Sequence, residues 1–429
     1  MTKATDGEMK ASLRQLARKV FDFGSGEAVS RLCGIVTLLF LAHRYGVLVV
    51  GVYALAQSML GYSYPIIDFG LRHVGARLVA QYPQAAAEIA GQVQRRRMMM
   101  AAVLLPFLLI YAASTKLPTE AKIFLFAFAA IGSLYAVSLD WMAWGREHLR
   151  LASFGRAAVP VSILACLFLG RNSGRVLWWL VLGNAIGNGL QAAIFWTWWR
   201  RHRPEQEQQI SLAVIRDSLA WRRTSVMGLA WLCNLAFNTI DMLMLGTMSN
   251  PQQVGLYSAA YRVVNQVLYT YYLMTIVLYP QLARQDREQR MRMLKPRILF
   301  SLLGIGVAIA AVLSVSRRPL LALLFGHQFL PATLLLLLLA WAIPFDFLTS
   351  YLSNAYIAWG MEKKILLCTI VAAGSNVVLN LIWIPAYGAT AAAVNTLISY
   401  VIFLVSLALA GRFAKELTSE AEPVSELTA

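Results

Sequence analysis

The chain has 429 residues, of which 59% are hydrophobic and only 14% are charged. Soluble domains contain roughly 45–50% apolar and about 25% charged residues, so a soluble chain of this length could not bury its apolar surface. The apolar residues also gather in runs close to the ~20 residues that a helix needs to cross a bilayer. Composition therefore excludes an ordinary soluble protein and predicts an all-α polytopic membrane protein.

Twelve apolar runs follow one another along the chain, and Gly, Pro or charged residues mark the ends of most of them. None shows the alternation of a transmembrane β-strand. We therefore predict helices at 24–43, 47–69, 98–114, 121–143, 152–169, 176–199, 225–247, 254–279, 298–316, 332–353, 364–385 and 388–410.

The distribution of the basic residues supports this count. With the N-terminus inside, twelve spans place 28 of the 38 Lys and Arg residues in cytoplasmic segments, Arg72 and Arg97 among them, and 7 on the other side. The positive-inside rule predicts this bias, so both termini are expected in the cytoplasm. The net charge of +17 lies in short loops rather than on one face, so nucleic acid is not an expected partner.

An internal repeat predicts two six-helix lobes. Residues 51–56 align with 255–260, and the same offset superimposes the second span on the eighth. An even repeat keeps the same topology, so the lobes would be related by an axis along the membrane normal. We predict a lobe at 1–199, a cytoplasmic linker at 200–223, a lobe at 224–412 and a cytoplasmic tail at 413–429. The segments 44–53 and 248–257 are expected to approach each other.

Short motifs along these spans resemble a known family. Ser30-Arg31-Leu32-Cys33-Gly34 resembles the Ser-Arg-x-x-Gly opening of polysaccharide and lipid II flippases. The stretches that match the Wzx-type pattern are 51–54, 68–72, 241–246, 254–262, 324–332 and 384–393. From about residue 13 to 412 the chain is similar to the polysaccharide-transporter branch of the MATE-like MOP flippase superfamily.

That resemblance implies a transporter function. It implies alternating access in a bacterial inner membrane, moving an undecaprenyl-pyrophosphate-type lipid-linked oligosaccharide from the cytoplasmic to the outer leaflet. The cargo would serve O-antigen, exopolysaccharide or capsule synthesis, with other polysaccharide assembly proteins as partners.

Two arginines within spans are the predicted pyrophosphate-binding residues. A charge in the hydrocarbon core costs at least ~2.5–3.5 kcal/mol on insertion scales, so each needs a partner or a wet cavity. Arg31 has Glu27 four residues before it, and this pair could equally hold the helix in place. Arg262 has no acid within a helical turn. In lipid II flippases, arginines at the matching positions are implicated in pyrophosphate binding. A further arginine of those proteins is Thr37 here, which makes lipid II itself a less suitable cargo.

Polar stripes along several spans are candidates for cavity lining. Helix-to-helix hydrogen bonding explains any single stripe equally well. Besides Glu27, the candidates are Asn184, Asn188, Gln191, Asn234, Asn238, Asn265, Gln266 and Tyr269, and a further pair is Asn376 and Asn380.

Three carboxylates within spans, Asp140, Asp241 and Asp346, are candidates for coupling transport to H⁺ or Na⁺. No other cofactor is expected. The four cysteines have no CxxC spacing, so no metal site is indicated.

Alternative functions remain. Walker A, HExxH and GxSxG motifs are absent, so an enzyme is not expected. A polysaccharide polymerase or ligase should carry a large outer loop, whereas the longest here spans about 15 residues, from Arg317 to Pro331. A MATE-like multidrug exporter is the closer alternative. Such an exporter should present acidic residues to its cationic cargo, whereas this chain presents Arg31 and Arg262.

Overall fold

The computed structural model describes the chain apart from residues 1–5, 204–214, 216, 218, 284–295 and 421–429. Within the described residues the regular secondary structure is entirely helical. The chain divides into two compact units. Unit 1 comprises Met1–Tyr45 and Leu55–Leu232, and unit 2 comprises Gly46–Ala54 and Cys233–Ala429.

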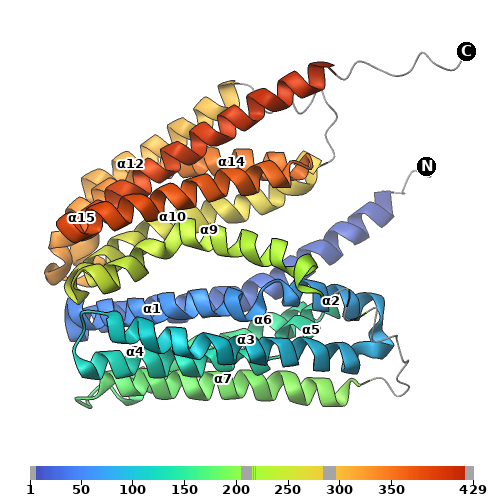
Figure 1. Cartoon of the computed structure of the whole chain (residues 1–429), viewed down its shortest axis with the longest axis horizontal. Coiled ribbons are helices and arrows are strands. Elements are labelled where there is room, and N and C mark those ends of the chain that lie inside the picture. The colour runs from blue at the N-terminus through green and yellow to red at the C-terminus, as the bar shows by residue number, and fades with distance from the viewer. Residues whose placement is uncertain (1–5, 204–214, 216, 218, 284–295, 421–429) are drawn as a thin grey trace, which may run out of the picture. The chain divides into compact units, whose positions relative to one another are not determined.

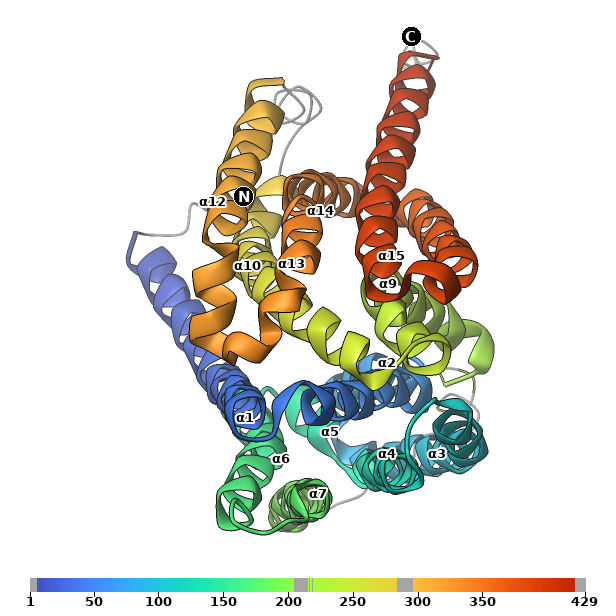
Figure 2. The same cartoon turned by 90° about the vertical axis from the view of Figure 1, so that its left-hand side faces the viewer.

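Unit 1 is a bundle built on α1 (Asp6–Asp68), whose segment 46–54 belongs to unit 2. The elements that follow are α2 (Leu71–Gln81), η1 (Pro83–Ala85), α3 (Ala86–Ser114), α4 (Thr119–Gly132), η2 (Ser133–Val137), α5 (Asp140–Gly145), α6 (Leu149–Leu169) and α7 (Val176–Arg201). In Figure 1, α3, α4 and α7 run side by side, and Figure 2 shows α6 next to α7. Apolar side chains such as Ile89, Trp141 and Phe195 fill the core between α2, α3, α5 and α7.

Unit 2 contains the following helices. They are α9 (Trp221–Met248, from residue 233 onward), α10 (Pro251–Ala283), α12 (Pro296–Phe325), η3 (His327–Ala332), α13 (Thr333–Ala340), α14 (Ile343–Ala358) and α15 (Glu362–Glu420). Helix α14 packs against α10, α12 and α15. The core around α14 and α15 combines aliphatic residues with aromatic ones, among them Phe237, Tyr356, Tyr400 and Phe403.

Two glycines reverse the chain inside the long helices. Gly46 in α1 has φ 83° and Gly388 in α15 has φ 57°, which is left-handed backbone that glycine adopts without a steric penalty. Figure 1 shows both reversals. They fall between predicted spans 24–43 and 47–69, and at the start of the predicted span 388–410. Gln253 accepts a hydrogen bond from the Ala389 amide through Oε1 at 2.7 Å, which holds the second reversal.

The helices are long and apolar enough for a membrane. Seven stretches of the described chain qualify, or eight if the bent pair His327–Ala340 and Ile343–Ala358 is one span. Two of the seven, Gly24–Asp68 and Glu362–Gly411, have 45 and 50 residues and contain the reversals at Gly46 and Gly388. The all-α polytopic membrane class is confirmed. The count of twelve spans and the side on which the termini lie stay predictions.

Three local features differ from the sequence prediction. The span predicted at 121–143 is broken into α4, η2 and α5, and the span predicted at 332–353 is bent by 41° between α13 and α14. Residues 71–81, predicted as a loop, form the helix α2. Each break sits where polar or proline residues interrupt the apolar run, at Ser138 and Asp140 in the first case and at Pro344 in the second.

The two segments matched by the internal repeat do approach each other, within unit 2. A Cβ atom added at Gly51 would overlap the carbonyl oxygen of Pro251, and one added at Gly255 would overlap the carbonyl oxygen of Val47. The two helix backbones are therefore in direct contact at these glycines, with no side chain between them. Only glycine at both positions allows this approach.

Alanine at either glycine should therefore destabilise unit 2. We expect Gly51→Ala and Gly255→Ala each to lower the free energy of unfolding by about 1–3 kcal/mol, because the helices must separate to admit a methyl group. Gly61→Ala is the matched control on the same helix, since a Cβ there meets no atom within 4 Å. Thermal unfolding in detergent measures the difference. Equal stability of the three variants would show that the crossing tolerates a methyl group.

Candidate functional site

The most polar buried site of unit 2 surrounds Asp241 on α9. Its side chain is 1% exposed and accepts three hydrogen bonds. The donors are the Tyr257 hydroxyl at 2.7 Å, the Thr396 hydroxyl at 2.8 Å and the Asn380 amide at 2.5 Å. Helices α9, α10 and α15 therefore meet at one carboxylate.

A row of amides extends this site along α15. Asn380 donates to Oδ1 of Asn376 at 2.9 Å and accepts from Nδ2 of Asn395 at 2.9 Å, and all three are fully buried. Within the part of the chain that the structure describes, Asp241 forms no salt bridge. Its neighbours are neutral oxygen- and nitrogen-bearing groups, so its negative charge has no positive partner there. This arrangement suits a proton or a small monovalent cation.

The second predicted carboxylate of unit 2, Asp346 on α14, lies in a separate polar group. Ser350 donates to its Oδ2 at 3.4 Å, and Tyr400 also hydrogen-bonds it. The Tyr400 hydroxyl in turn reaches Oδ1 of Asn238 at 3.4 Å. Asp346 is half-buried, so it is less enclosed than Asp241.

Arg262 lies on α10, five residues after Tyr257. It is half-buried, and its electrostatic neighbours are the phenols of Tyr53 and Tyr261. Among the described residues it forms no salt bridge or hydrogen bond. Further along the helix the predicted stripe is accessible, because Asn265 and Gln266 are exposed and Tyr269 is half-buried.

The predicted stripe on α9 is joined within unit 2. Asn238 donates to the carbonyl of Asn234 at 2.7 Å, and the Tyr261 hydroxyl donates to the carbonyl of Asn238 at 2.8 Å. Asn234 is exposed and Asn238 is half-buried. The structure therefore brings Asn238 of α9 into contact with α10 at Tyr261, the residue before Arg262.

Arg31, in unit 1, forms the predicted ion pair. Its Nε lies 3.1 Å from Oε1 of Glu27, and about a third of each side chain is exposed. This confirms the local pairing. Arg31 and Arg262 belong to different units.

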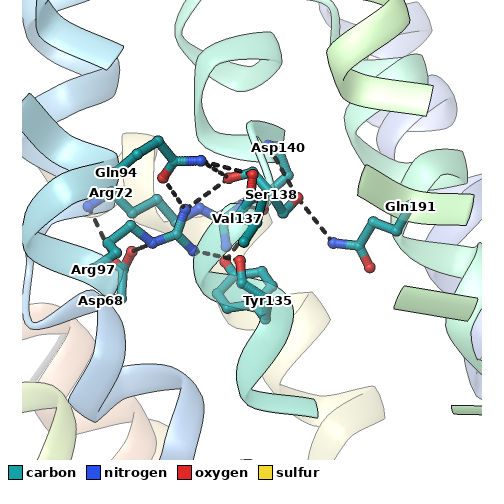
Figure 3. A network of polar contacts seen from close by, with 9 residues as sticks. All are labelled: Asp68, Arg72, Gln94, Arg97, Tyr135, Val137, Ser138, Asp140 and Gln191. Atoms are coloured by element: carbon teal, nitrogen blue, oxygen red, sulfur yellow. Dashed lines mark hydrogen bonds and ion pairs between the residues drawn. The ribbon is translucent and has the colours of Figure 1, made fainter. Parts of the chain in front are cut away.

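Unit 1 contains a second buried polar network, which Figure 3 shows. Nε of Arg97 lies 3.4 Å from Oδ1 of Asp68, and Nη2 of Arg72 lies 3.5 Å from Oδ2 of Asp140. The Arg97 guanidinium also stacks 4.5 Å above the ring centre of Tyr135, whose hydroxyl donates to Asp140 at 3.3 Å. Two acids and two bases thus balance inside the unit.

This network supplies hydrogen-bond donors to the backbone carbonyls at the break in the fourth span. Because the helix unwinds at η2, no backbone amide of the described residues donates to the carbonyls of Val137 and Ser138, whereas the Tyr135 carbonyl accepts the Ser138 amide at 2.9 Å. Arg97 donates to the Tyr135 and Ser138 carbonyls, the latter at 2.8 Å, and Gln94 donates to those of Val137 and Ser138. Unpaired carbonyls in a membrane cost several kcal/mol each. Helix α3 therefore supplies the donors that keep α4, η2 and α5 together.

Arg97 and Arg72 correct the sequence analysis, which assigned both to a loop between spans, whereas both lie in helices; their cytoplasmic side stays a prediction. Arg97 lies inside α3 with no exposed surface, and Arg72 pairs with a fully buried acid. Their charges are consequently neutralised within the fold. Asp140, a predicted coupling carboxylate, has Arg72 as its partner.

The predicted polar stripe on α7 forms hydrogen bonds within unit 1. Asn184 donates to the Phe128 carbonyl at 2.8 Å, Asn188 donates to Asn184 at 2.9 Å, and Gln191 donates to the Ser138 hydroxyl at 3.1 Å. All three are at least nine-tenths buried. These bonds are the helix-to-helix alternative that the sequence left open, and a role in lining a cavity stays a prediction.

Sequence reasoning missed several members of these sites. Asn395 and Thr396 lie four and three residues before Ser399 in the last span, and polar residues at this helical spacing in an apolar run could have indicated them. Asp68 and Arg72 stand four residues apart, a spacing that predicts a local pair. Tyr257 carries no such signal, because a lone tyrosine near a helix start is ordinary.

The comparisons with known proteins show the family of the chain. A model of the family described as polysaccharide biosynthesis protein matches residues 16–285, which is more than half of the chain. The chain therefore belongs to that family. No curated protein sequence matches it.

The fold is that of the MATE-like flippases and transporters of the MOP superfamily. The chain is similar to the lipid II flippase MurJ in an inward closed conformation, with a TM-score of 0.68, 14% identity and coverage of 91% of this chain and 87% of that one. It is similar to an inward-facing multidrug resistance MATE family transporter, with a TM-score of 0.70, 12% identity and coverage of 92% and 96%. The Vibrio cholerae MATE transporter VcmN in its bent form gives a TM-score of 0.56, 15% identity and coverage of 94% and 98%.

Family and fold thus define a multi-pass membrane protein of the polysaccharide biosynthesis family, and both the fold class and the family were predicted from the sequence. At these identities the solved structures bear on the fold alone.

Proposed function

We propose that the protein is a flippase for a lipid-linked oligosaccharide of the undecaprenyl-pyrophosphate type. It moves this cargo from the cytoplasmic to the outer leaflet of a bacterial inner membrane, for O-antigen, exopolysaccharide or capsule synthesis with other polysaccharide assembly proteins. The match to the polysaccharide biosynthesis family over residues 16–285 is the observation that carries the proposal. The MurJ-like fold supports it.

Arg262 is the proposed pyrophosphate-binding residue. It lies in an apolar helix and forms no ion pair among the described residues, so an anionic ligand would compensate its charge. Guanidinium is suited to this role because its planar fork binds two phosphate oxygens at once. The exposed amides of Asn265 and Gln266 continue the same helix and can bind sugar hydroxyls.

Arg31 is the proposed second pyrophosphate ligand. Glu27 neutralises part of its charge at 3.1 Å, so its contribution should be smaller than that of Arg262. Glu27 would release Arg31 when the doubly charged headgroup enters. Alternating access of the two lobes would then carry the headgroup across while the polyprenyl tail stays in lipid, because the bilayer already satisfies its apolar surface.

Asp241 is the proposed coupling residue. A buried carboxylate that lacks a cation is costly in a membrane, so binding H⁺ or Na⁺ there is favourable. Asp140 is less suited, because Arg72 already neutralises it. Asp346 is half-buried and so needs a cation less.

Replacement of the arginines tests the function. In a strain whose surface polysaccharide depends on this protein, we expect Arg262→Ala to abolish export, Arg262→Lys to restore part of it and Arg31→Ala to reduce it less. The ranking follows from the unpaired state of Arg262 and the pairing of Arg31. Surface polysaccharide per cell, normalised to the amount of protein in the membrane, is the measurement. Full export by Arg262→Ala would refute the assignment.

A MATE-like multidrug exporter is the second candidate, favoured by the likeness to MATE transporters. A cationic drug would need a free acid in its path, and the half-buried Asp346 is the residue that could provide one. Drug sensitivity of the deletion strain separates the two functions. Increased sensitivity with normal surface polysaccharide would favour the exporter.

A further inference from the structure

Tyr257 is placed between the carboxylate Asp241 and the helix that carries Arg262. Its side chain is 1% exposed, and its hydroxyl donates to Oδ2 of Asp241 at 2.7 Å. The same hydroxyl lies 3.3 Å from that of Thr396. It therefore has a second partner available whenever Asp241 no longer accepts its proton.

The contacts between α9 and α10 form two successive rungs. In the first, Tyr257 of α10 binds the Asp241 side chain of α9. In the second, one turn later on α10 and one turn earlier on α9, Tyr261 donates to the carbonyl of Asn238 at 2.8 Å. The two tyrosine rings stack with centroids 6.1 Å apart and planes 14° apart. A shift of the first rung is therefore passed to the second through packed rings.

The second rung adjoins the proposed headgroup residue. Arg262 follows Tyr261 directly in the chain, and Tyr261 is one of the two phenols that act electrostatically on it. Tyr257 and Arg262 are separated by five residues of one continuous helix, about 7.5 Å of rise. A rigid helix of this length moves both side chains together.

Cation binding at Asp241 must change the first rung. A charged carboxylate oxygen accepts the Tyr257 proton, but a proton or Na⁺ on that oxygen occupies the same lone pairs. The hydroxyl then turns to Thr396 or becomes a ligand of the cation itself. Either outcome alters the length and direction of the only contact that Tyr257 makes with α9 through its hydroxyl among the described residues.

We propose that Tyr257 is the positioning residue that couples cation occupancy of Asp241 to the placement of Arg262, through the α9–α10 contacts. This inference rests on the proposed function. Tyr257 then links the coupling cation, bound at Asp241, to the lipid headgroup, bound at Arg262. Neither of these ligands contacts the other's site.

The Tyr257→Phe variant tests the link, because it keeps the ring stack and removes only the hydroxyl. The Tyr271→Phe variant is the matched control on the same helix, since it keeps the ring stack with Phe347 and removes a hydroxyl that donates to the Phe347 carbonyl of α14, outside the α9–α10 contacts. Each protein is placed in lipid nanodiscs, and the dissociation constant for undecaprenyl pyrophosphate is measured. One arm varies Na⁺ against K⁺ at fixed pH, and the other varies pH at fixed Na⁺.

We expect the wild-type affinity to change by about 5-fold or more with the coupling cation in one of the two arms, the lower end of typical coupling between sites. In Tyr257→Phe the ratio of the lipid dissociation constants without and with the coupling cation should be near one in both arms, and Tyr271→Phe should keep the wild-type ratio. A purely structural role would instead lower the melting temperature and the affinity without changing that ratio.

The inference would be overturned if Tyr257→Phe kept the wild-type ratio of dissociation constants. It would also be overturned if the ratio fell to one in both variants alike. A wild-type ratio of one with tight lipid binding would overturn the coupling while leaving the flippase proposal in place. Absence of binding by the wild type, in every condition, would refute the proposed function itself.

Discussion

Replacing Arg97 by alanine is expected to lower the free energy of unfolding by about 3–5 kcal/mol, the usual cost of removing one partner from a buried ion pair. Two effects combine. Asp68 loses its cation, and the carbonyls of Tyr135 and Ser138 at the break in the fourth span each lose the hydrogen bond from Arg97 and keep one other donor. Lysine should recover little of this stability, because one ammonium group cannot reach both carbonyls and the carboxylate as a planar fork does.

The matched control for this prediction is Arg95→Ala. Arg95 stands two residues earlier on the same helix and is exposed, so its loss should leave stability nearly unchanged. Thermal unfolding gives the difference, and hydrogen exchange of residues 133–139 should accelerate only in Arg97→Ala. The double variant Asp68→Asn with Arg97→Gln should cost less than the two single variants together, because neither charge is then left alone. Equal stability of Arg95→Ala and Arg97→Ala would contradict the role of the network.

Asn at position 241 is expected to abolish the dependence of transport on a cation gradient, with a fall in gradient-driven transport of roughly tenfold, within the range of typical coupling free energies. Asparagine preserves the size of the side chain and can accept bonds from Tyr257 and Thr396, so the packing of α9, α10 and α15 should survive. It carries no negative charge and cannot hold H⁺ or Na⁺. Downhill equilibration of the lipid across the bilayer should therefore continue.

Proteoliposomes with an imposed Na⁺ or proton gradient provide the measurement. The translocated undecaprenyl-pyrophosphate-linked sugar is scored by its accessibility to an added enzyme. Asp346→Asn is the control, because it alters the other predicted coupling carboxylate of unit 2, which Ser350 and Tyr400 contact. Loss of gradient dependence in Asp346→Asn, with Asp241→Asn unaffected, would move the coupling site to α14.

Buried arginines show why the site was harder to predict than the fold. The sequence counts Arg97 with Arg95 and Arg96, since three adjacent arginines read as a loop. A helix separates them by about 100° each, and this turns Arg97 alone toward Asp68 and Tyr135 while Arg95 stays exposed. Which member of a basic run is buried depends on the direction of the neighbouring helices, and no local pattern reports that direction.

Asp241 illustrates the same difficulty: the sequence identifies the residue but not its partners. As a carboxylate in an apolar run it is a predictable candidate, and Asn376 and Asn380 stand out by their helical spacing. Its partners Tyr257 and Thr396 lie 16 and 155 residues away in the chain. Only the packing of α9 against α10 and α15 makes them one site.

The sequence by itself determined the class, the family and the positions of the chain reversals. The apolar runs, the glycines between them and the ordered motifs are local properties, and the bilayer allows few other structures for such runs. The tertiary structure alone decided the partners of each buried charge: Arg72 for Asp140, Arg97 for Asp68, and neutral donors for Asp241. The physical reason is that a charge in a low-dielectric interior is stabilised by whichever groups helix packing brings within about 3–4 Å, whatever their distance along the chain.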